Sequence, residues 1–124
     1  MSGNSLLLDT NIVLYLLGGD EVLSNLLYDR RLYVSFITEL ELLGYPDITE
    51  AEKQAIRQFL EECIIIDINK SIKEEVIKLK QSRKIKLPDS IIIATSLYLD
   101  IPVMSADDDF NRITEADVVY YEPG

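Results

Sequence analysis

Four acidic residues that are far apart in the chain could form one chemical site. Asp9 follows a short apolar run, Asp107 comes two residues after a later apolar run, and Asp89 opens the apolar segment that leads into that later run. Glu41 lies in a helical pattern after a second predicted strand. Sites in open α/β sheets form outside the carboxyl ends of the strands. We therefore expect these acids to meet at that edge of a sheet.

Clustered carboxylates of this kind are suited to metal-assisted chemistry. They repel one another and raise each other's pKa, and the chain has no histidine, which excludes histidine-based acid–base catalysis, Ser-His-Asp triads and most zinc sites with nitrogen ligands. Hard cations such as Mg²⁺ or Mn²⁺ prefer oxygen ligands. One or two such ions activate a water molecule and stabilise a leaving oxygen, so phosphoryl transfer would need no protein base.

Each acid also has a simpler interpretation. Asp9 could cap the helix that follows it, and Asp89, after Pro88, could be a first-turn acid that favours the helix dipole. The run 107–109 could be a solvated loop with a helix cap, and Glu41 could be an exposed helix residue. These interpretations weaken when taken together, because each acid is tied to a strand end or to a buried helix of the same sheet.

The elements that would position these acids alternate along the chain. Thr49 and Ser71 each begin a capping-box pattern, and Pro88 begins an apolar helix that should be deeply packed. Such alternation predicts right-handed crossovers and a three-layer α/β/α sandwich with a mainly parallel sheet of about five strands. Strands are expected at 5–8, 31–35, 64–68, 102–105 and 118–121, and helices at 12–17, 22–28, 37–44, 49–63, 71–86 and 88–99, with a short helix or turn at 107–113.

Length and composition are typical of one compact protein. With 124 residues and 48% apolar content, the chain can bury a real core, and we expect a single domain spanning 1–124. Cys63 is the only cysteine, which excludes an intrachain disulfide and favours a reducing compartment. The sequence has neither an apolar run of about 18 residues nor a signal peptide's basic region. We expect a cytoplasmic protein without a membrane segment.

Four segments in order, 8–11, 37–44, 87–94 and 104–110, resemble the four motifs of PIN domains. The likeness is closest to VapC-type toxins of bacterial type II toxin–antitoxin pairs. It implies an Mg²⁺- or Mn²⁺-dependent endoribonuclease, a homodimer, and silencing by a cognate antitoxin protein. The residues that it implies are the catalytic acids Asp9, Glu41, Asp89 and Asp107, the metal ligands Asp9, Asp89, Asp107 and Asp109, and the supporting polar residues Asn11 and Ser105.

Basic residues are concentrated in one part of an acidic chain. The formal net charge is −10, but seven of the twelve basic residues fall between Lys70 and Lys86. Overall acidity argues against tight non-specific binding to nucleic acid, because phosphate affinity comes from Lys and Arg. The basic segment could simply be a solvated helix face. Our hypothesis is that its position before Asp89 places four side chains along an RNA path, namely Lys80, Arg83, Lys84 and Lys86.

Two residue choices and two other functions remain open. Glu39 and Glu41 are separated by roughly 200° on a helix, and both are flanked by apolar residues, so only the resemblance favours Glu41. Asp107 is preferred to Asp109 on its spacing to Ser105. The chain could instead be a noncatalytic PIN-fold module that binds a metal or a partner. A receiver-like phosphoacceptor domain is a weaker alternative, because Ala106 follows Ser105 where such a domain carries a lysine.

Overall fold

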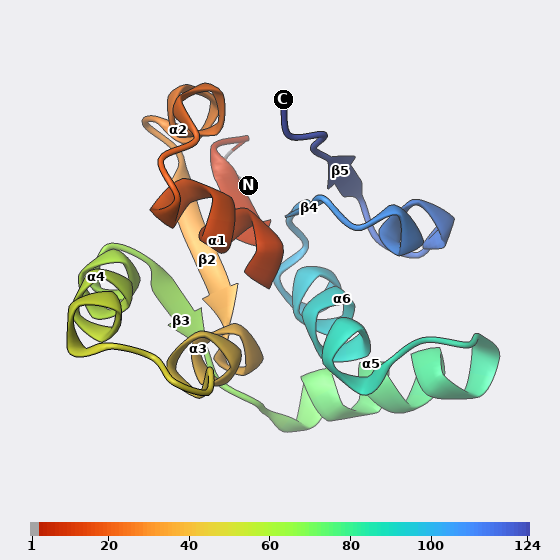
Figure 1. Ribbon diagram of the computed structural model, residues 1–124. Coiled ribbons are helices and arrows are strands. Elements are labelled where there is room, and N and C mark those ends of the chain that lie inside the picture. The colour runs from red at the N-terminus through yellow and green to blue at the C-terminus, as the bar shows by residue number, and fades with distance from the viewer. Residues whose placement is uncertain (1–2) are drawn as a thin grey trace.

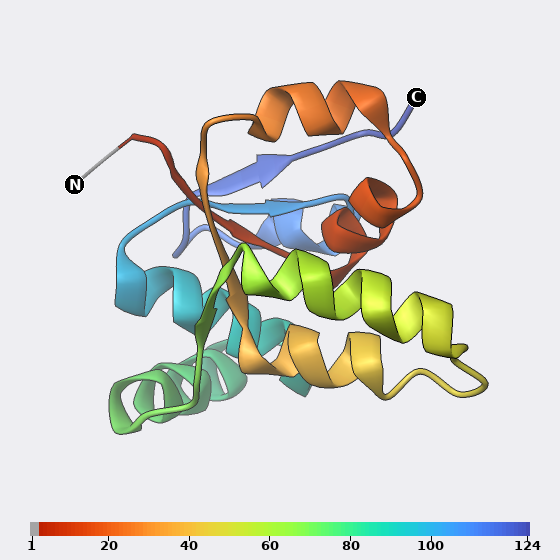
Figure 2. The ribbon, with the colours of Figure 1, turned by 90° about the vertical axis from the view of Figure 1, so that its left-hand side faces the viewer.

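The protein is a three-layer α/β/α sandwich around a sheet of five parallel strands, as the sequence predicts (Figures 1 and 2). The computed structural model describes residues 3–124. The strands are β1 (Ser5–Leu8), β2 (Arg31–Ser35), β3 (Ile64–Ile66), β4 (Val103–Ser105) and β5 (Val118–Tyr120). The helices are α1 (Thr10–Leu17), α2 (Glu21–Leu27), α3 (Phe36–Leu43), α4 (Glu50–Glu61), α5 (Lys70–Ser82), α6 (Leu87–Leu99) and the 3₁₀ helix η1 (Asp108–Arg112).

Strand β1 lies at the centre of the sheet, whose order is β3-β2-β1-β4-β5. All four of its residues are buried, as expected for an unbroken apolar run in a parallel sheet with both faces covered. Leu8 at its end is in register with Met104 of β4. The backbone N–H of Asp9 then donates to the Met104 carbonyl over 2.9 Å. The first strand therefore ends directly beside the fourth, at the carboxyl edge where the acids were expected.

Alternate residues of β1 supply the two halves of the core, because successive side chains in a strand point to opposite faces. Leu6 and Leu8 pack with α1, α2 and α4. Leu7 packs on the other side with α5, α6 and η1. Figure 1 shows α5 and α6 lying together on that second face. Within the described residues, no helix is long and apolar enough to cross a membrane.

Helix α6 is the most deeply buried helix, as its apolar sequence predicts. Every residue from Ser90 to Ser96 is buried. Its hydroxyls are satisfied locally, since Thr95 donates to the Ile91 carbonyl over 2.7 Å and Ser96 to the Ile101 carbonyl over 2.6 Å. A buried helix with no unpaired polar group is a firm support. It carries Asp89 in its first turn.

Several expected element boundaries were wrong. The capping box at Thr49 is present, but the one at Ser71 is not. Helix α5 begins at Lys70 because the side chain of Asn69 accepts a hydrogen bond from the Ile72 N–H over 2.9 Å. The same helix ends at Ser82 instead of continuing to residue 86, because Arg83 is extended. Strand β3 likewise ends at Ile66, two residues early.

The start of α5 yields a stability prediction. Replacement of a capping Asn by Ala costs about 1 kcal/mol, so Asn69→Ala should lower the free energy of unfolding by about that amount. Ser71→Ala is the matched control, and it should leave stability unchanged or slightly higher, because Ala is the better residue inside a helix. Urea denaturation of both variants measures the difference. A larger loss of stability in Ser71→Ala than in Asn69→Ala would show that Ser71 is the capping residue.

Candidate active site

Asp9 is both a helix cap and the buried centre of the acidic site. Its side chain is only 5% exposed. One carboxylate oxygen accepts from the Thr10 N–H over 2.8 Å, and the other accepts from the Ser105 hydroxyl over 2.6 Å. Burial raises the pKa of Asp9, against the lowering effect of these two hydrogen bonds, and the charges of Asp107 and Glu41 raise it further. The capping interpretation and the site interpretation therefore apply to the same residue.

Asp89 reaches the same place from the other layer, at the start of α6. Burial raises its pKa from 3.8 to about 6, the charges of Asp9, Asp107 and Glu41 add to the rise, and Lys86 opposes it. Such effects require charges that lie close together. The structure thus brings together the four acids that the sequence singles out, although they come from four different segments.

Glu41 is held in the cluster by two threonines that sequence reasoning missed. The Thr10 hydroxyl donates to the Glu41 carboxylate over 2.7 Å, and the Thr10 and Thr38 hydroxyls are 3.0 Å apart. Because Thr10 has one hydroxyl proton, Thr38 must donate to it. The signals in the sequence are weak: Thr10 follows Asp9, and Thr38 precedes Glu41 by three residues on one helical face.

Glu39 points to a different part of the surface. It lines a depression of about 210 Å³ with Arg57 of α4 and Ile65 of β3. The charge of Glu39 is not among the causes that raise the pKa of Asp9 or Asp89. Of the two glutamates left open by helix periodicity, Glu41 is therefore the one beside Asp9.

Ser105 and Asn11, the two expected supporting residues, hold the loop after β4. The Ser105 hydroxyl donates to Asp9, and its oxygen accepts from the Asp107 N–H over 3.0 Å. The Asn11 side-chain oxygen accepts from the Ala106 N–H over 3.2 Å. The two side chains thereby fix the backbone between β4 and η1, and with it the position of Asp107 relative to Asp9.

Asp107 and Asp109 differ in their contacts. Asp107 caps η1 by accepting from the Asp109 N–H over 2.9 Å, and its charge raises the pKa of both Asp9 and Asp89. The Asp109 carboxylate instead accepts from Arg112 over 2.6 Å, and its side chain is 55% exposed. Asp107 thus belongs to the acidic cluster, whereas Asp109 lies at its border.

The cluster fits a hard divalent cation in its chemistry. Its charged members are all carboxylates, and burial, followed by the repulsion between these charges, raises the pKa of Asp9 and Asp89. A bound Mg²⁺ or Mn²⁺ would relieve that repulsion. Within residues 3–124, no three acidic side chains already stand in a metal-binding arrangement. Side chains such as Asp89 and Glu41, which are partly or fully exposed, would have to turn towards an ion.

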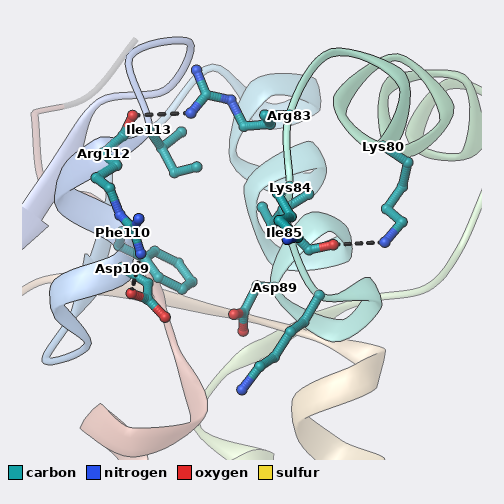
Figure 3. Close-up of a pocket in the computed structure, with 10 residues that line it drawn as sticks. Lys80, Arg83, Lys84, Ile85, Asp89, Asp109, Phe110, Arg112 and Ile113 are labelled. Carbon is teal, nitrogen blue, oxygen red and sulfur yellow. Dashed lines mark hydrogen bonds and ion pairs between the residues drawn. The ribbon is translucent and has the colours of Figure 1, made fainter.

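A hollow of about 650 Å³ adjoins the cluster between the 83–86 loop, the start of α6 and η1 (Figure 3). We call it the basic hollow. Asp89 and Asp109 stand on its acidic side, and Ile85, Phe110 and Ile113 contribute apolar surface. The basic side chains that line it are Lys80, Arg83, Lys84, Lys86 and Arg112. All four residues of the expected RNA path therefore lie at one place, next to the acids.

Comparisons with known proteins show which family the sequence and the fold match. A model of the PIN domain family matches residues 6–116. The chain is similar to a toxin–antitoxin complex from Klebsiella pneumoniae, at 32% identity and a TM-score of 0.80, over 94% of this chain and 98% of that one. It is similar to VapBC-1 from nontypeable Haemophilus influenzae, at 30% identity and a TM-score of 0.74, over 94% and 97%.

A more distant structure shares the fold alone. VapBC2 from Rickettsia felis, bound to a DNA fragment from its promoter, is 18% identical with a TM-score of 0.83, over 95% of this chain and 99% of that one. No curated protein matches the chain. The structures from Klebsiella pneumoniae and Haemophilus influenzae are therefore similar to the chain in sequence as well as in fold.

Proposed function

This chain belongs to the PIN domain family, and from that premise we propose that it is a metal-dependent endoribonuclease and the toxin of a type II toxin–antitoxin pair. One observation carries the proposal. Asp9, Glu41, Asp89 and Asp107 come from four segments and lie close enough to shift the pKa of Asp9 or Asp89. A fold gains nothing in stability from crowding acids, so a cluster of this kind indicates function.

The residues would divide the work as follows. Asp9, Asp89 and Asp107 would hold Mg²⁺ or Mn²⁺, and Asp109 would add a carboxylate at the border. The ion, when bound, polarises the phosphodiester and lowers the pKa of water. Ser105 fixes the orientation of Asp9 through its 2.6 Å hydrogen bond.

Glu41 would orient the attacking water. Thr10 occupies one of its carboxylate oxygens, which leaves the other free to accept a hydrogen bond from that water. The exposure of Glu41 to solvent allows substrate and water to reach it. Its role would therefore depend on the Thr38-to-Thr10-to-Glu41 chain of hydrogen bonds described above.

The test is cleavage of a mixed single-stranded RNA pool by the purified full chain. We expect cutting with Mg²⁺ or Mn²⁺, none with EDTA, and recovery when the metal is restored. Glu41→Gln should lose roughly 10–100-fold in rate, as for residues that support a metal site. Glu39→Gln removes the same charge two residues away and should cut like the wild type.

Three results would count against the proposal in different ways. Cutting in EDTA would show that the cleavage does not depend on a metal ion. Equal losses of cleavage rate in Glu41→Gln and Glu39→Gln would show that Glu41 has no specific role. Metal binding without cutting of any RNA would favour the noncatalytic PIN-fold module.

We propose the partners from the relatives. The relatives from Klebsiella pneumoniae and Haemophilus influenzae come from toxin–antitoxin complexes, so a cognate antitoxin protein and a cytoplasmic location are proposed for this chain. A homodimer is proposed as well. Helix α4 buries Ile56 and Leu60 within the chain, whereas α2 leaves Val22 64% and Leu26 48% exposed. Helix α2 is therefore the better candidate for a partner surface.

A further inference from the structure

We infer that the basic hollow binds one phosphodiester of the RNA backbone next to the bond that is cut, and that Lys84 and Lys86 supply its contacts. This inference rests on the proposed nuclease function. It divides the four expected RNA-path residues into two that build the hollow and two that bind the substrate. The division follows from what each side chain already contacts.

Charge in the hollow is opposite to charge in the chain as a whole. Five basic and two acidic side chains line it, whereas the whole chain has a net charge of −10. Five of the twelve basic residues of the chain thus line one concave surface. A local excess of positive charge in a concave place attracts anions even when the protein is acidic overall.

Lys80 and Arg83 are engaged in building the hollow. The Lys80 ammonium donates to the Ile85 carbonyl over 2.6 Å. Arg83 donates through Nε and a terminal nitrogen to both carboxylate oxygens of Glu115, over 3.0 and 2.8 Å, and through its other terminal nitrogen to the Arg112 carbonyl over 3.0 Å. Figure 3 shows Arg83 reaching across to η1 and Lys80 reaching back to Ile85.

These contacts join two segments that are distant in the chain. The bidentate pair ties the loop after α5 to the segment after η1, 32 residues later. A planar guanidinium fork bound at three points has little freedom left. The wall of the hollow is therefore formed before any substrate arrives, and Lys80 and Arg83 are positioning residues.

Lys84 and Lys86 are the two free cations of the hollow. Among residues 3–124, neither ammonium group has a hydrogen bond or an ion pair, and both side chains are exposed. Arg112 is different, because it is paired with Asp109. Lys86 also lies close enough to Asp89 to lower the pKa of that carboxyl. An anion bound by Lys86 would therefore sit immediately beside the acidic site.

A backbone phosphodiester is the anion that fits this place. It keeps its negative charge at neutral pH, it recurs at every nucleotide, and it needs no base-specific contact. Two lysines acting as point charges suit such a contact. The hollow would thus hold the strand in register while the neighbouring linkage lies at Asp9, Asp89 and Asp107.

The experiment measures RNA binding without cleavage. The full chain carrying Asp9→Asn is titrated against a fluorescein-labelled single-stranded RNA that the wild type cuts, at several salt concentrations. Adding Lys84→Gln and Lys86→Gln should reduce the slope of log K against log salt by about 0.7, since the two lysines together neutralise one phosphate and each lost phosphate contact on a single strand is worth about 0.7. The same relation gives a loss in affinity of about fivefold for the double variant at 0.1 M salt.

A matched variant and a modified substrate sharpen the result. Lys70→Gln with Lys73→Gln removes the same charge from the other end of α5 and should leave affinity and slope nearly unchanged. Neutral methylphosphonate linkages are then placed singly around the cut. At one linkage next to the cut, the methylphosphonate should lower the affinity as much as the lysine variant does. The modified RNA and the lysine variant together should then lose no more affinity than either change alone.

The outcomes separate this inference from the proposed function. If the wild type cuts RNA but Lys84→Gln with Lys86→Gln keeps its affinity and slope, the phosphodiester site is wrong and the nuclease stands. Equal losses in the Lys70 and Lys73 control would reduce the effect to net charge and also overturn the site. If the wild type neither binds nor cuts RNA, the nuclease proposal fails, and this inference fails with it.

Discussion

Asp9→Asn is expected to abolish RNA cleavage while leaving the protein at least as stable as the wild type. Asp9 is a buried carboxylate whose burial disfavours its charge, and Asp107 and Glu41 add repulsion. The amide removes that charge and keeps the shape. Its oxygen can still accept from the Thr10 N–H as a helix cap, and its NH₂ group can donate to the Ser105 oxygen.

The expected loss of activity is large. A bound metal ion supplies several kcal/mol of transition-state stabilisation, and each 1.36 kcal/mol is tenfold in rate. We therefore expect the cleavage rate to fall by at least about 10³-fold. The melting temperature should stay equal or rise by a few degrees, since 1 kcal/mol corresponds to about 2–8 °C in domains of this size range.

Asp117→Asn is the matched control for this change. Asp117 is exposed and precedes β5, at the opposite edge of the parallel sheet. It should leave both the cleavage rate and the melting temperature unchanged. Cleavage by Asp9→Asn at the wild-type rate would show that Asp9 is not part of the site. A collapse of its melting temperature would show that Asp9 serves the fold.

The fold follows from patterns that are local in the sequence. The run from Leu6 to Leu8 has no polar break, and the structure places it at the centre of the sheet, buried on both faces. Pro88 and the apolar residues after it likewise correspond to the buried helix α6. Local patterns were weaker at helix starts. Ser71 matches a capping box, but Asn69 lies two residues earlier and satisfies the Ile72 N–H first.

The site depends on contacts that no local pattern reports. Asp9, Asp89 and Asp107 were found because each is tied to a strand end or a buried helix of one sheet. The structure distinguishes Glu41 from Glu39 through a hydrogen bond from Thr10, which is 31 residues away in the chain. The division of the basic residues required the pairing of Arg83 with Glu115 across 32. The roles of these residues in metal and RNA binding remain predictions.

Without metal, the protein should become more stable as the pH falls from 7.5 to 5, the reverse of ordinary acid denaturation. Asp89 has a pKa of about 6 in the folded chain against an ordinary value of 3.8. Between these two values the folded state binds more protons than the unfolded state. Stability therefore falls as pH rises through that window, and the raised pKa of Asp9 acts in the same direction.

The size of the effect is limited by solvent. The full shift of Asp89 corresponds to about 3 kcal/mol, of which about 1.4 kcal/mol is gained by pH 5. Its side chain is only partly buried, so less than about 1 kcal/mol should remain at pH 5 after screening. Below about pH 4 the trend should reverse. Asp20 and Glu52 have lowered pKa values because they accept backbone hydrogen bonds at helix starts, and those contributions are lost as the carboxyls take up protons.

Protons and divalent ions should compete for the same carboxylates. At pH 7.5, Mg²⁺ at about 100 times its Kd should stabilise the folded chain by about 2.7 kcal/mol, and this gain should shrink at pH 5, where Asp89 is protonated. Urea denaturation at both pH values, with Mg²⁺ and with EDTA, measures all four states. Asp89→Asn should flatten the pH dependence and weaken the response to Mg²⁺. Equal gains from Mg²⁺ at both pH values would mean that the ion binds elsewhere. An unchanged pH profile in Asp89→Asn would mean that another group carries the pH dependence.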